Sequence, residues 1–399
     1  MIAAIGLIAG VGADLPAVNA AAGNKPELSP PPQPEVATAS QPVASAKTSN
    51  PPAPTPAAAP TPGSPPEKAG EIGQKPSLAP LPKTAKIGSV HGPYDAGTCS
   101  LCHKSDDVKN PGPITKPLVA MCLECHDEFK KLTSRKFTHT PAQQNCTACH
   151  NPHNSAQPKL LVDEMTHLCT KCHEPIKKLL TGAKVKHGVM TTEKKCSNCH
   201  NPHGANVEHL LIQLPFDLCM KCHSKDDMTD AEGRKLTNFK KLLDENPVWH
   251  APVAAKDCSA CHKPHGSDHV RLLGSDYPPQ FYSPYDPKNY ALCFDCHNDQ
   301  MVTTPETTSL TQFRDGNRNL HYLHVNKPDR GRTCRACHEV HASTQPHHIR
   351  DSVPYGPKGW PLKINYVKTE TGGSCERTCH TKKTYNNKVL KVPPPLEKK

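Results

Sequence analysis

All twenty cysteines of this 399-residue chain fall into ten closely spaced pairs, and a histidine follows each pair directly. Two residues separate the cysteines in nine pairs, and three separate them in the tenth. The pairs are Cys99/Cys102, Cys122/Cys125, Cys146/Cys149, Cys169/Cys172, Cys196/Cys199, Cys219/Cys222, Cys258/Cys261, Cys293/Cys296, Cys334/Cys337 and Cys375/Cys379. The histidines that follow them are His103, His126, His150, His173, His200, His223, His262, His297, His338 and His380. Two thiols at this spacing can reach two vinyl groups of one porphyrin, and the adjacent imidazole can then bind its iron.

Other uses of paired cysteines explain this pattern less well. A disulfide framework does not require a histidine after every second cysteine. Zinc sites take their remaining ligands from variable distances along the chain. A thioredoxin-like motif would occur once, beside a βαβ pattern that is absent here. The sequence therefore predicts ten covalently attached haem c groups, with a local disulfide as the alternative at Cys375/Cys379.

From residue 91 onward the chain is an internal repeat, and each unit contains two of these motifs. The first cysteines of alternate motifs fall at positions 99, 146, 196, 258 and 334, so the repeats lengthen toward the C-terminus. The five repeats cover approximately residues 91–138, 139–186, 187–249, 250–320 and 321–385.

Two further histidine positions recur within the repeats and are candidates for the second axial ligand of each iron. An upstream histidine precedes the first motif at His91, His139, His187, His250 and His324. A second position, which we call the crossing histidine, follows the first motif at His153, His203, His265 and His341. We expect the upstream histidine to ligate the first haem of its own repeat, and the crossing histidine to ligate the second.

The first repeat departs from this pattern because Asp106 occupies the position of the crossing histidine. The haem at Cys122/Cys125 would then need a ligand from elsewhere in the chain. The remaining candidates are His167, His209, His269, His321, His347 and His348. If none of them reached the iron, this haem would have an open position.

The elements that position these residues are predicted to be short. Apolar residues three apart, such as Phe129 and Leu132, indicate helices of one or two turns after the second motifs. Residues 230–245 form the longest predicted helix, and no alternating strand pattern persists. Hydrophobic residues make up only 35% of the chain, too few for an ordinary core. The predicted fold is mostly irregular, with short α-helices wrapped around a chain of closely packed covalent haems in five two-haem repeats, and little or no β-sheet.

Two segments precede the predicted decahaem cytochrome c domain at residues 89–399. Residues 1–23 contain an apolar stretch and a small-residue cleavage site, and they are predicted to be a signal peptide. Residues 24–88 are rich in proline and alanine and are predicted to be a disordered linker. Because c-type haem is attached outside the energy-transducing membrane, we expect an exported protein that is periplasmic, on the outer surface or extracellular.

The pattern C-x-x-C-H-N-P-H-G, followed by leucines and L-C-x-x-C-H, resembles the doubled C-x-x-C-H family of multihaem c-type cytochromes. The resemblance covers about residues 90–385 and is clearest at Cys146–His173 and Cys196–His223. It implies electron transfer in respiratory or extracellular electron-transfer chains, in a protein of the decahaem type.

Two functions follow from these features. The first is a low-potential bis-histidine decahaem cytochrome that conducts electrons in an anaerobic respiratory or extracellular chain and has no catalytic residue. The alternative is a multihaem reductase of nitrite, hydroxylamine or a metal ion at one open haem. No motif ends in lysine and only seven methionines are present, which favours the carrier.

The expected partners are other redox proteins, such as cytochromes or quinol-oxidising complexes. A metal or mineral acceptor and a homo-oligomer or filament are left open. The net charge of +11 is offset by the haem propionates, so nucleic acid is not expected as a partner. The longest apolar run is also too short for a membrane span.

Overall fold

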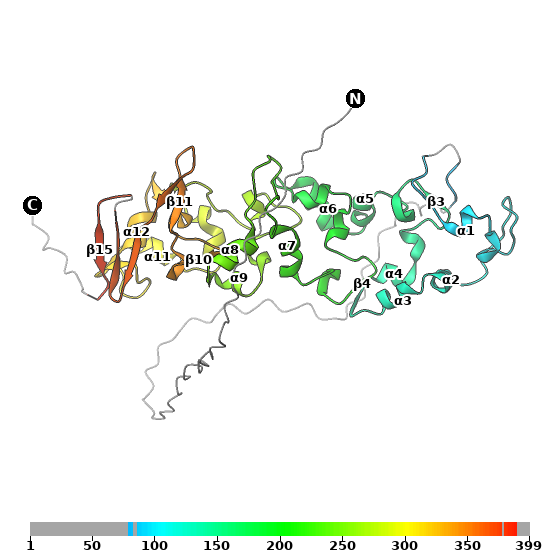
Figure 1. Ribbon diagram of the computed structural model, residues 1–399, viewed down its shortest axis with the longest axis horizontal. Coiled ribbons are helices and arrows are strands. Elements are labelled where there is room, and N and C mark those ends of the chain that lie inside the picture. The colour runs from blue at the N-terminus through cyan, green and yellow to red at the C-terminus, as the bar shows by residue number, and fades with distance from the viewer. Residues whose placement is uncertain (1–78, 83–85, 377–378, 389–399) are drawn as a thin grey trace, which may run out of the picture. The chain divides into compact units, whose positions relative to one another are not determined.

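The computed structural model describes residues 79–82, 86–376 and 379–388. The chain divides into two units, Met1–Glu71 and Ile72–Lys399, and all described residues belong to the second. Within this unit the elements follow one another in near chain order from α1 to β15 (Figure 1). The predicted signal peptide at 1–23 and most of the predicted linker at 24–88 lie outside the described residues.

The helices are short, as the sequence analysis expected. The two longest helices in the described part, α6 and α7, have nine residues each. The α-helices are α1 (Gly92–Asp95), α2 (Leu118–Cys125), α3 (Glu128–Thr133), α4 (Thr140–Gln144), α5 (Met165–Thr170), α6 (Glu174–Gly182), α7 (Pro215–His223), α8 (Phe239–Glu245), α9 (Ala251–Ala254), α10 (Ala291–Phe294), α11 (Gln300–Thr303) and α12 (Leu320–Val325). The second motifs of the first four repeats lie at or beside helices, whereas the first motifs form 3-10 turns such as Cys146–Ala148.

The prediction of one long helix over 230–245 is wrong. Only α8, the end of that segment, is helical. The earlier part turns back on itself, with Thr229 bridged to Lys235 and Gly233 at a φ of +77° between them. Glycine accepts this left-handed conformation without steric cost. The chain can therefore turn here, and the helix begins only at Phe239.

The expectation of little or no β-sheet is also wrong. Seven small antiparallel sheets occur within the described residues. The strands are β1 (Ser89–Val90), β2 (Phe137–Thr138), β3 (Asn154–Ser155), β4 (Gly204–Ala205), β5 (Val248–Trp249), β6 (Tyr282–Ser283), β7 (Arg314–Asp315), β8 (Arg318–Asn319), β9 (Gly331–Arg332), β10 (Ala342–Ser343), β11 (Ser352–Tyr355), β12 (Trp360–Lys363), β13 (Tyr366–Thr369), β14 (Gly372–Cys375) and β15 (Lys383–Asn386). Most have two residues, too few for an alternating pattern to be visible in sequence.

Three of these small sheets join segments of successive repeats. β1 pairs with β3, β2 with β4, and β5 with β10. In each pair the first strand ends directly before an upstream histidine, and the second begins directly after a crossing histidine. Val185 and Ser267 form the equivalent single bridge, shortly before the upstream His187 and shortly after the crossing His265. Backbone pairing therefore brings the upstream and crossing histidines of neighbouring repeats together.

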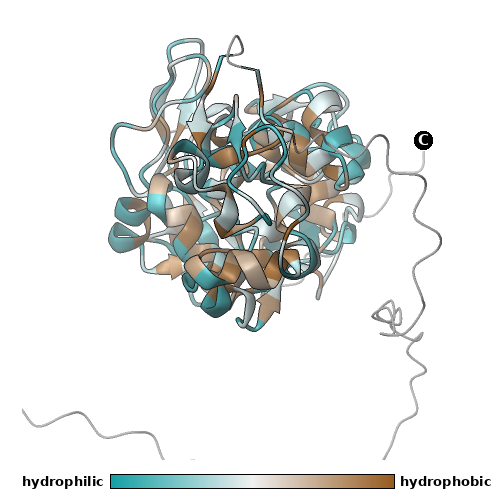
Figure 2. Ribbon diagram, turned by 90° about the vertical axis from the view of Figure 1, so that its right-hand side faces the viewer, coloured by the Kyte–Doolittle hydropathy of each residue, from teal (hydrophilic) through white to brown (hydrophobic). Residues whose placement is uncertain are grey.

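The C-terminal part holds the longer strands and most of the side-chain core. β11 pairs with β12, and β14 lies between β13 and β15. Val353, Leu362 and Ile364 form one buried cluster there, and Tyr277, Tyr290, Val302 and Val325 form another. In Figure 2 hydrophobic and hydrophilic segments are interspersed around the ribbon. In the part that the structure describes, no helix has the length and apolar character to cross a membrane.

Candidate functional site

Nine of the ten motif histidines face a second histidine across a nearly constant gap. The ring centroids in these pairs lie 6.0–6.3 Å apart, and the ring planes are 8–23° from parallel. The pairs are His91/His126, His103/His153, His139/His173, His150/His203, His187/His223, His200/His265, His250/His297, His262/His341 and His321/His338. For the tenth motif, burial lowers the pKa of His324, and Arg332 and then His380 lower it further, so His380 lies in the neighbourhood of His324.

The gap between the paired rings fits one metal ion. An imidazole nitrogen lies about 1.1 Å from its ring centre and binds a transition metal at about 2 Å, so two rings on opposite sides of one metal have centres about 6 Å apart. In the described part of the chain no group of three or more metal-binding side chains occurs. Two imidazoles alone do not complete the coordination of iron, whereas a porphyrin supplies the equatorial nitrogens. The donor set therefore fits haem.

The upstream histidines do not face the motifs that the sequence analysis expected. His91 faces His126 of the second motif, and not His103 of the first. The same relation holds at His139/His173, His187/His223 and His250/His297. The expected pairing of each upstream histidine with the first haem of its repeat is wrong, because the turn after this histidine carries the first motif away from it.

The crossing histidines reach back into the preceding repeat. His153 faces His103, and His203 faces His150. His265 and His341 likewise face the first-motif histidines of the third and fourth repeats. The expected pairing with the second haem of the same repeat is therefore wrong. The strand ladders explain the difference, because they align each crossing histidine with the upstream histidine of the previous repeat.

The presence of Asp106 in place of a crossing histidine therefore leaves no motif histidine of the first repeat without a facing histidine. The first repeat has no predecessor whose first motif would need a crossing histidine, and its own second-motif histidine, His126, faces His91. In the last repeat His321 faces His338. His321 was one of six candidates for the haem at Cys122/Cys125, but it faces a different motif. The expectation that one of those six ligates that haem is wrong, because His91 faces His126.

Backbone carbonyls hold the first-motif histidines in a common orientation. In each repeat the histidine Nδ1 bonds to the carbonyl nine residues further on, at 2.7–3.0 Å. The acceptors are the carbonyls of Gly112, Lys159, His209, Arg271 and His347. This contact leaves Nε2 free to bind a metal and makes the ring a stronger ligand. The sequence analysis missed this role of the carbonyls and named only the rings of His209 and His347 as candidate ligands. Lys159, His209 and Arg271 each stand directly before two leucines.

The acceptor residues have an unusual backbone. Lys159, His209, Arg271 and His347 adopt φ values of 56–58°, and Gly112 adopts 74°. This left-handed conformation is uncommon for residues with side chains, and its repetition indicates a constraint shared by all five repeats. His209 and His347 therefore contribute their carbonyls, and not their rings, to the site.

Burial favours the neutral form of two of the paired imidazoles in particular. It lowers the pKa of His203 to about 4 and that of His321 to about 4, in both cases more than the neighbouring histidines do. A neutral imidazole has the free electron pair that metal binding requires.

Thiols of successive motifs approach one another along the whole row. Burial, and then the thiol of Cys146 in the next motif, raise the pKa of Cys122 to about 11. Each consecutive pair of motifs contains such neighbouring thiols: Cys102/Cys125, Cys122/Cys146, Cys149/Cys172, Cys169/Cys196, Cys199/Cys222, Cys219/Cys258, Cys261/Cys293, Cys293/Cys334 and Cys337/Cys375. The ten motifs thus follow one another in space in the order in which they occur in the sequence.

The motifs line one continuous cavity of about 6030 Å³. Divided among ten motifs, this is about 600 Å³ each, within the range of about 300–1,000 Å³ typical of cofactor pockets. Arg332 and Arg335 line the same cavity, and their buried Nε atoms lack a hydrogen-bond partner. A haem propionate is an acceptor of suitable charge for such groups.

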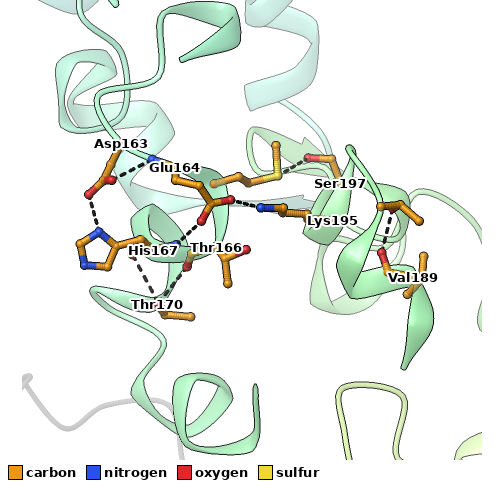
Figure 3. A network of polar contacts seen from close by, with 10 residues as sticks. Asp163, Glu164, Thr166, His167, Thr170, Val189, Lys195 and Ser197 are labelled. Carbon is orange, nitrogen blue, oxygen red and sulfur yellow. Dashed lines mark hydrogen bonds and ion pairs between the residues drawn. The ribbon is translucent and has the colours of Figure 1, made fainter. Parts of the chain in front are cut away.

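Two other candidate histidines have partners outside this cavity. His167 contacts Asp163 at 2.7 Å beside the ion pair of Glu164 and Lys195 (Figure 3), and His269 contacts Asp276 at 2.9 Å. Burial opposes the ionised form of Glu164, but the hydrogen bond from Lys195 prevails and lowers its pKa to about 2. This network ties the start of α5 to the turn at the next first motif.

Comparison with known families agrees with this geometry. The family model of the doubled CXXCH motif matches residues 91–131, 139–178, 187–228 and 250–302. Each match begins at an upstream histidine and ends shortly after a second motif. No curated protein matches the chain significantly. Four of the five repeats therefore carry the doubled motif of covalent haem attachment, and this supports a place for the chain among the multihaem c-type cytochromes.

Proposed function

We propose that this protein is an electron carrier, a bis-histidine decahaem c-type cytochrome. The observation that carries the proposal is the unbroken row of ten attachment motifs, nine of them with two facing imidazoles. Because each motif lies close to the next one, electrons could pass from haem to haem along the whole row. Residues 89–399 form the proposed haem domain.

The chain's own residues bind and orient the cofactors. The cysteines would attach each porphyrin covalently, and the paired histidines would bind its iron. The carbonyls of residues 112, 159, 209, 271 and 347 hold the first-motif rings in position. When bound, each haem supplies an iron that takes up and releases one electron. Apolar residues that line the cavity, including Leu160 and Leu210, would exclude water from it.

The ligand set favours a carrier over a reductase. A reductase needs an iron with an open position, and each motif histidine of the described pairs already faces a second imidazole. Bis-histidine ligation, with methionine scarce, also suits the low potentials of an anaerobic respiratory or extracellular chain. The proposed location is the periplasm or the cell exterior, with a signal peptide at 1–23 and a linker at 24–88. The proposed partners are other redox proteins.

The intact mass of the purified holoprotein tests the cofactor content. It should exceed the mass of the mature chain by ten haem masses, and nine would identify Cys375/Cys379 as unmodified or disulfide-bonded. The ferric spectrum should be wholly low-spin, and the reduced protein should not bind carbon monoxide. One high-spin haem with steady reduction of nitrite or hydroxylamine would replace the carrier with a reductase.

A further inference from the structure

One crossing histidine, His341, contacts a carboxylate. Its Nδ1 lies 3.4 Å from Oε1 of Glu339. The other carboxylate oxygen of Glu339 lies 2.7 Å from Nη2 of Arg350. The side chains of Glu339 and Arg350 are only 19% and 11% exposed, so solvent screens these contacts weakly.

The residues that correspond to Glu339 in the other repeats are not carboxylates. Two residues before the crossing histidine, these repeats have Asn151, Asn201 and Lys263. The two asparagines accept hydrogen bonds from the backbone N–H groups of His153 and His203, and not from the rings. Among the other paired histidines, His126 contacts Glu128 at 3.6 Å, but both side chains are about half exposed.

We propose that Glu339 lowers the reduction potential of the haem that His262 and His341 bind, the one attached at Cys258/Cys261. A carboxylate that accepts a hydrogen bond from a ligand imidazole makes this ligand more basic. A more basic ligand stabilises ferric over ferrous iron. The inference rests on the proposed function, because it requires a haem between these two histidines.

Arg350 acts as the positioning residue for this carboxylate. Its Nε donates to the carbonyl of His338 at 2.9 Å, while its Nη2 holds Glu339. The carboxylate is therefore fixed between two consecutive first motifs. The cysteines of this haem neighbour Cys219 on one side and Cys293 on the other, so it stands within the row and not at its end. A lowered potential there makes an uphill step that every electron must pass.

The test is a spectroelectrochemical titration of the full-length holoprotein and its Glu339→Gln variant. The amide keeps the shape of the side chain and removes its charge. We expect about a tenfold rise in the reduced-to-oxidised ratio of one haem in ten, a shift of about +59 mV for one electron. The difference between the two titration curves should integrate to a single haem. Glu370→Gln, which removes an exposed carboxylate in the turn after β13, is the charge-matched control and should give no difference.

A double-mutant cycle assigns the shifted haem. In a His341→Ala background the Glu339→Gln shift should disappear, because the ligand through which it acts is gone. A shift that persists there, or superimposable curves in the wild-type background, would overturn the proposal. If Glu339→Gln does not assemble, Glu339→Asp, which retracts the charge from His341, should shift the same haem upward by less, and no shift would equally overturn it. A haem mass below ten or a high-spin wild-type spectrum would instead contradict the proposed function.

Discussion

At the scale of single residues, a histidine's role depends on which motif it faces. His203 lies three residues after His200, yet its ring faces His150 of the preceding repeat at 6.1 Å. Phe129 packs edge-on against the same ring at 4.6 Å and helps to fix it. A haem proposed to bind at His150 would thus take its second ligand from the repeat that follows in the sequence.

His203→Ala should therefore create one five-coordinate haem at Cys146/Cys149. This haem should become high-spin and bind carbon monoxide when reduced, as absorption spectra of the holoprotein would show. His209→Ala is the matched control, because only its backbone carbonyl contacts His200 and its ring is exposed. If the carbon monoxide signal survives removal of both cysteines at 146 and 149, the assignment to this haem is wrong.

The ion pair between Glu164 and Lys195 should make the free energy of unfolding depend on pH in the acidic range. The pKa of Glu164 is about 2 in the folded protein, below the usual value of about 4.3 for an unfolded chain. The stabilisation is therefore present above pH ~4.3 and lost as the pH falls toward 2. Because both side chains are partly exposed, we expect only about 0.5–1 kcal/mol.

Glu164→Gln should reduce the difference in unfolding free energy between pH 5 and pH 3 by about this amount, measured by denaturant titration. Glu174→Gln, in an exposed contact with Lys177 at 3.7 Å, should leave the pH profile unchanged. Equal profiles for the wild type and Glu164→Gln would show that the pair contributes nothing.

At the scale of elements, short strand ladders position the ligands more than the helices do. β2 and β4 align residues 137–138 with 204–205, directly beside His139 and His203. The end of α3, which packs on β4, leaves no room for a side chain at Gly204, where a Cβ would lie 2.1 Å from the carbonyl oxygen of Leu132. This contact is with backbone, so it cannot be relieved by a rotamer change.

Gly204→Ala should therefore displace β4 and weaken the hold of His203 on its haem. We expect a loss of about 1–3 kcal/mol in stability, typical of overpacking, and a partial high-spin signal at Cys146/Cys149. Gly188→Ala is the control, because nothing lies within 4 Å of a Cβ at that position. Thermal unfolding and the ferric spectrum would distinguish them, and equal behaviour of both variants would refute this role of the ladder.

At the scale of the whole molecule, each repeat completes the one before it. The second-motif histidine faces the upstream histidine of its own repeat, whereas the first-motif histidine in each of the first four repeats faces the crossing histidine of the next. The last repeat closes the series with His321, which lies in α12. Such nearest-neighbour dependence is typical of repeat proteins.

A chain shortened after residue 186 should therefore carry four haems, of which one, at Cys146/Cys149, is high-spin. A chain shortened after residue 249 should carry six and move the high-spin site to Cys196/Cys199. Mass spectrometry and carbon monoxide binding measure both quantities. Wholly low-spin spectra for both shortened chains would contradict ligation across repeats.

Local chemistry could be predicted from the sequence because it depends on neighbours in the chain. The ten attachment motifs, the five repeats and the two recurring histidine positions were all visible, since two thiols and an imidazole at fixed spacing already specify their ligand. Four of those repeats match the doubled CXXCH family as expected. The short helices followed from the same local patterns.

Only the tertiary structure decided which histidines face each other. The spacing around His153 is equally compatible with the haems of its own repeat and of the preceding one, and pairing of β1 with β3 selects the latter. Strands of two residues are too short to show a periodic pattern in the sequence. A carbonyl acceptor such as that of Lys159 depends on backbone conformation and not on residue type. Contacts between repeats, which are long-range in sequence, therefore determined the histidine pairing that the sequence analysis assigned wrongly.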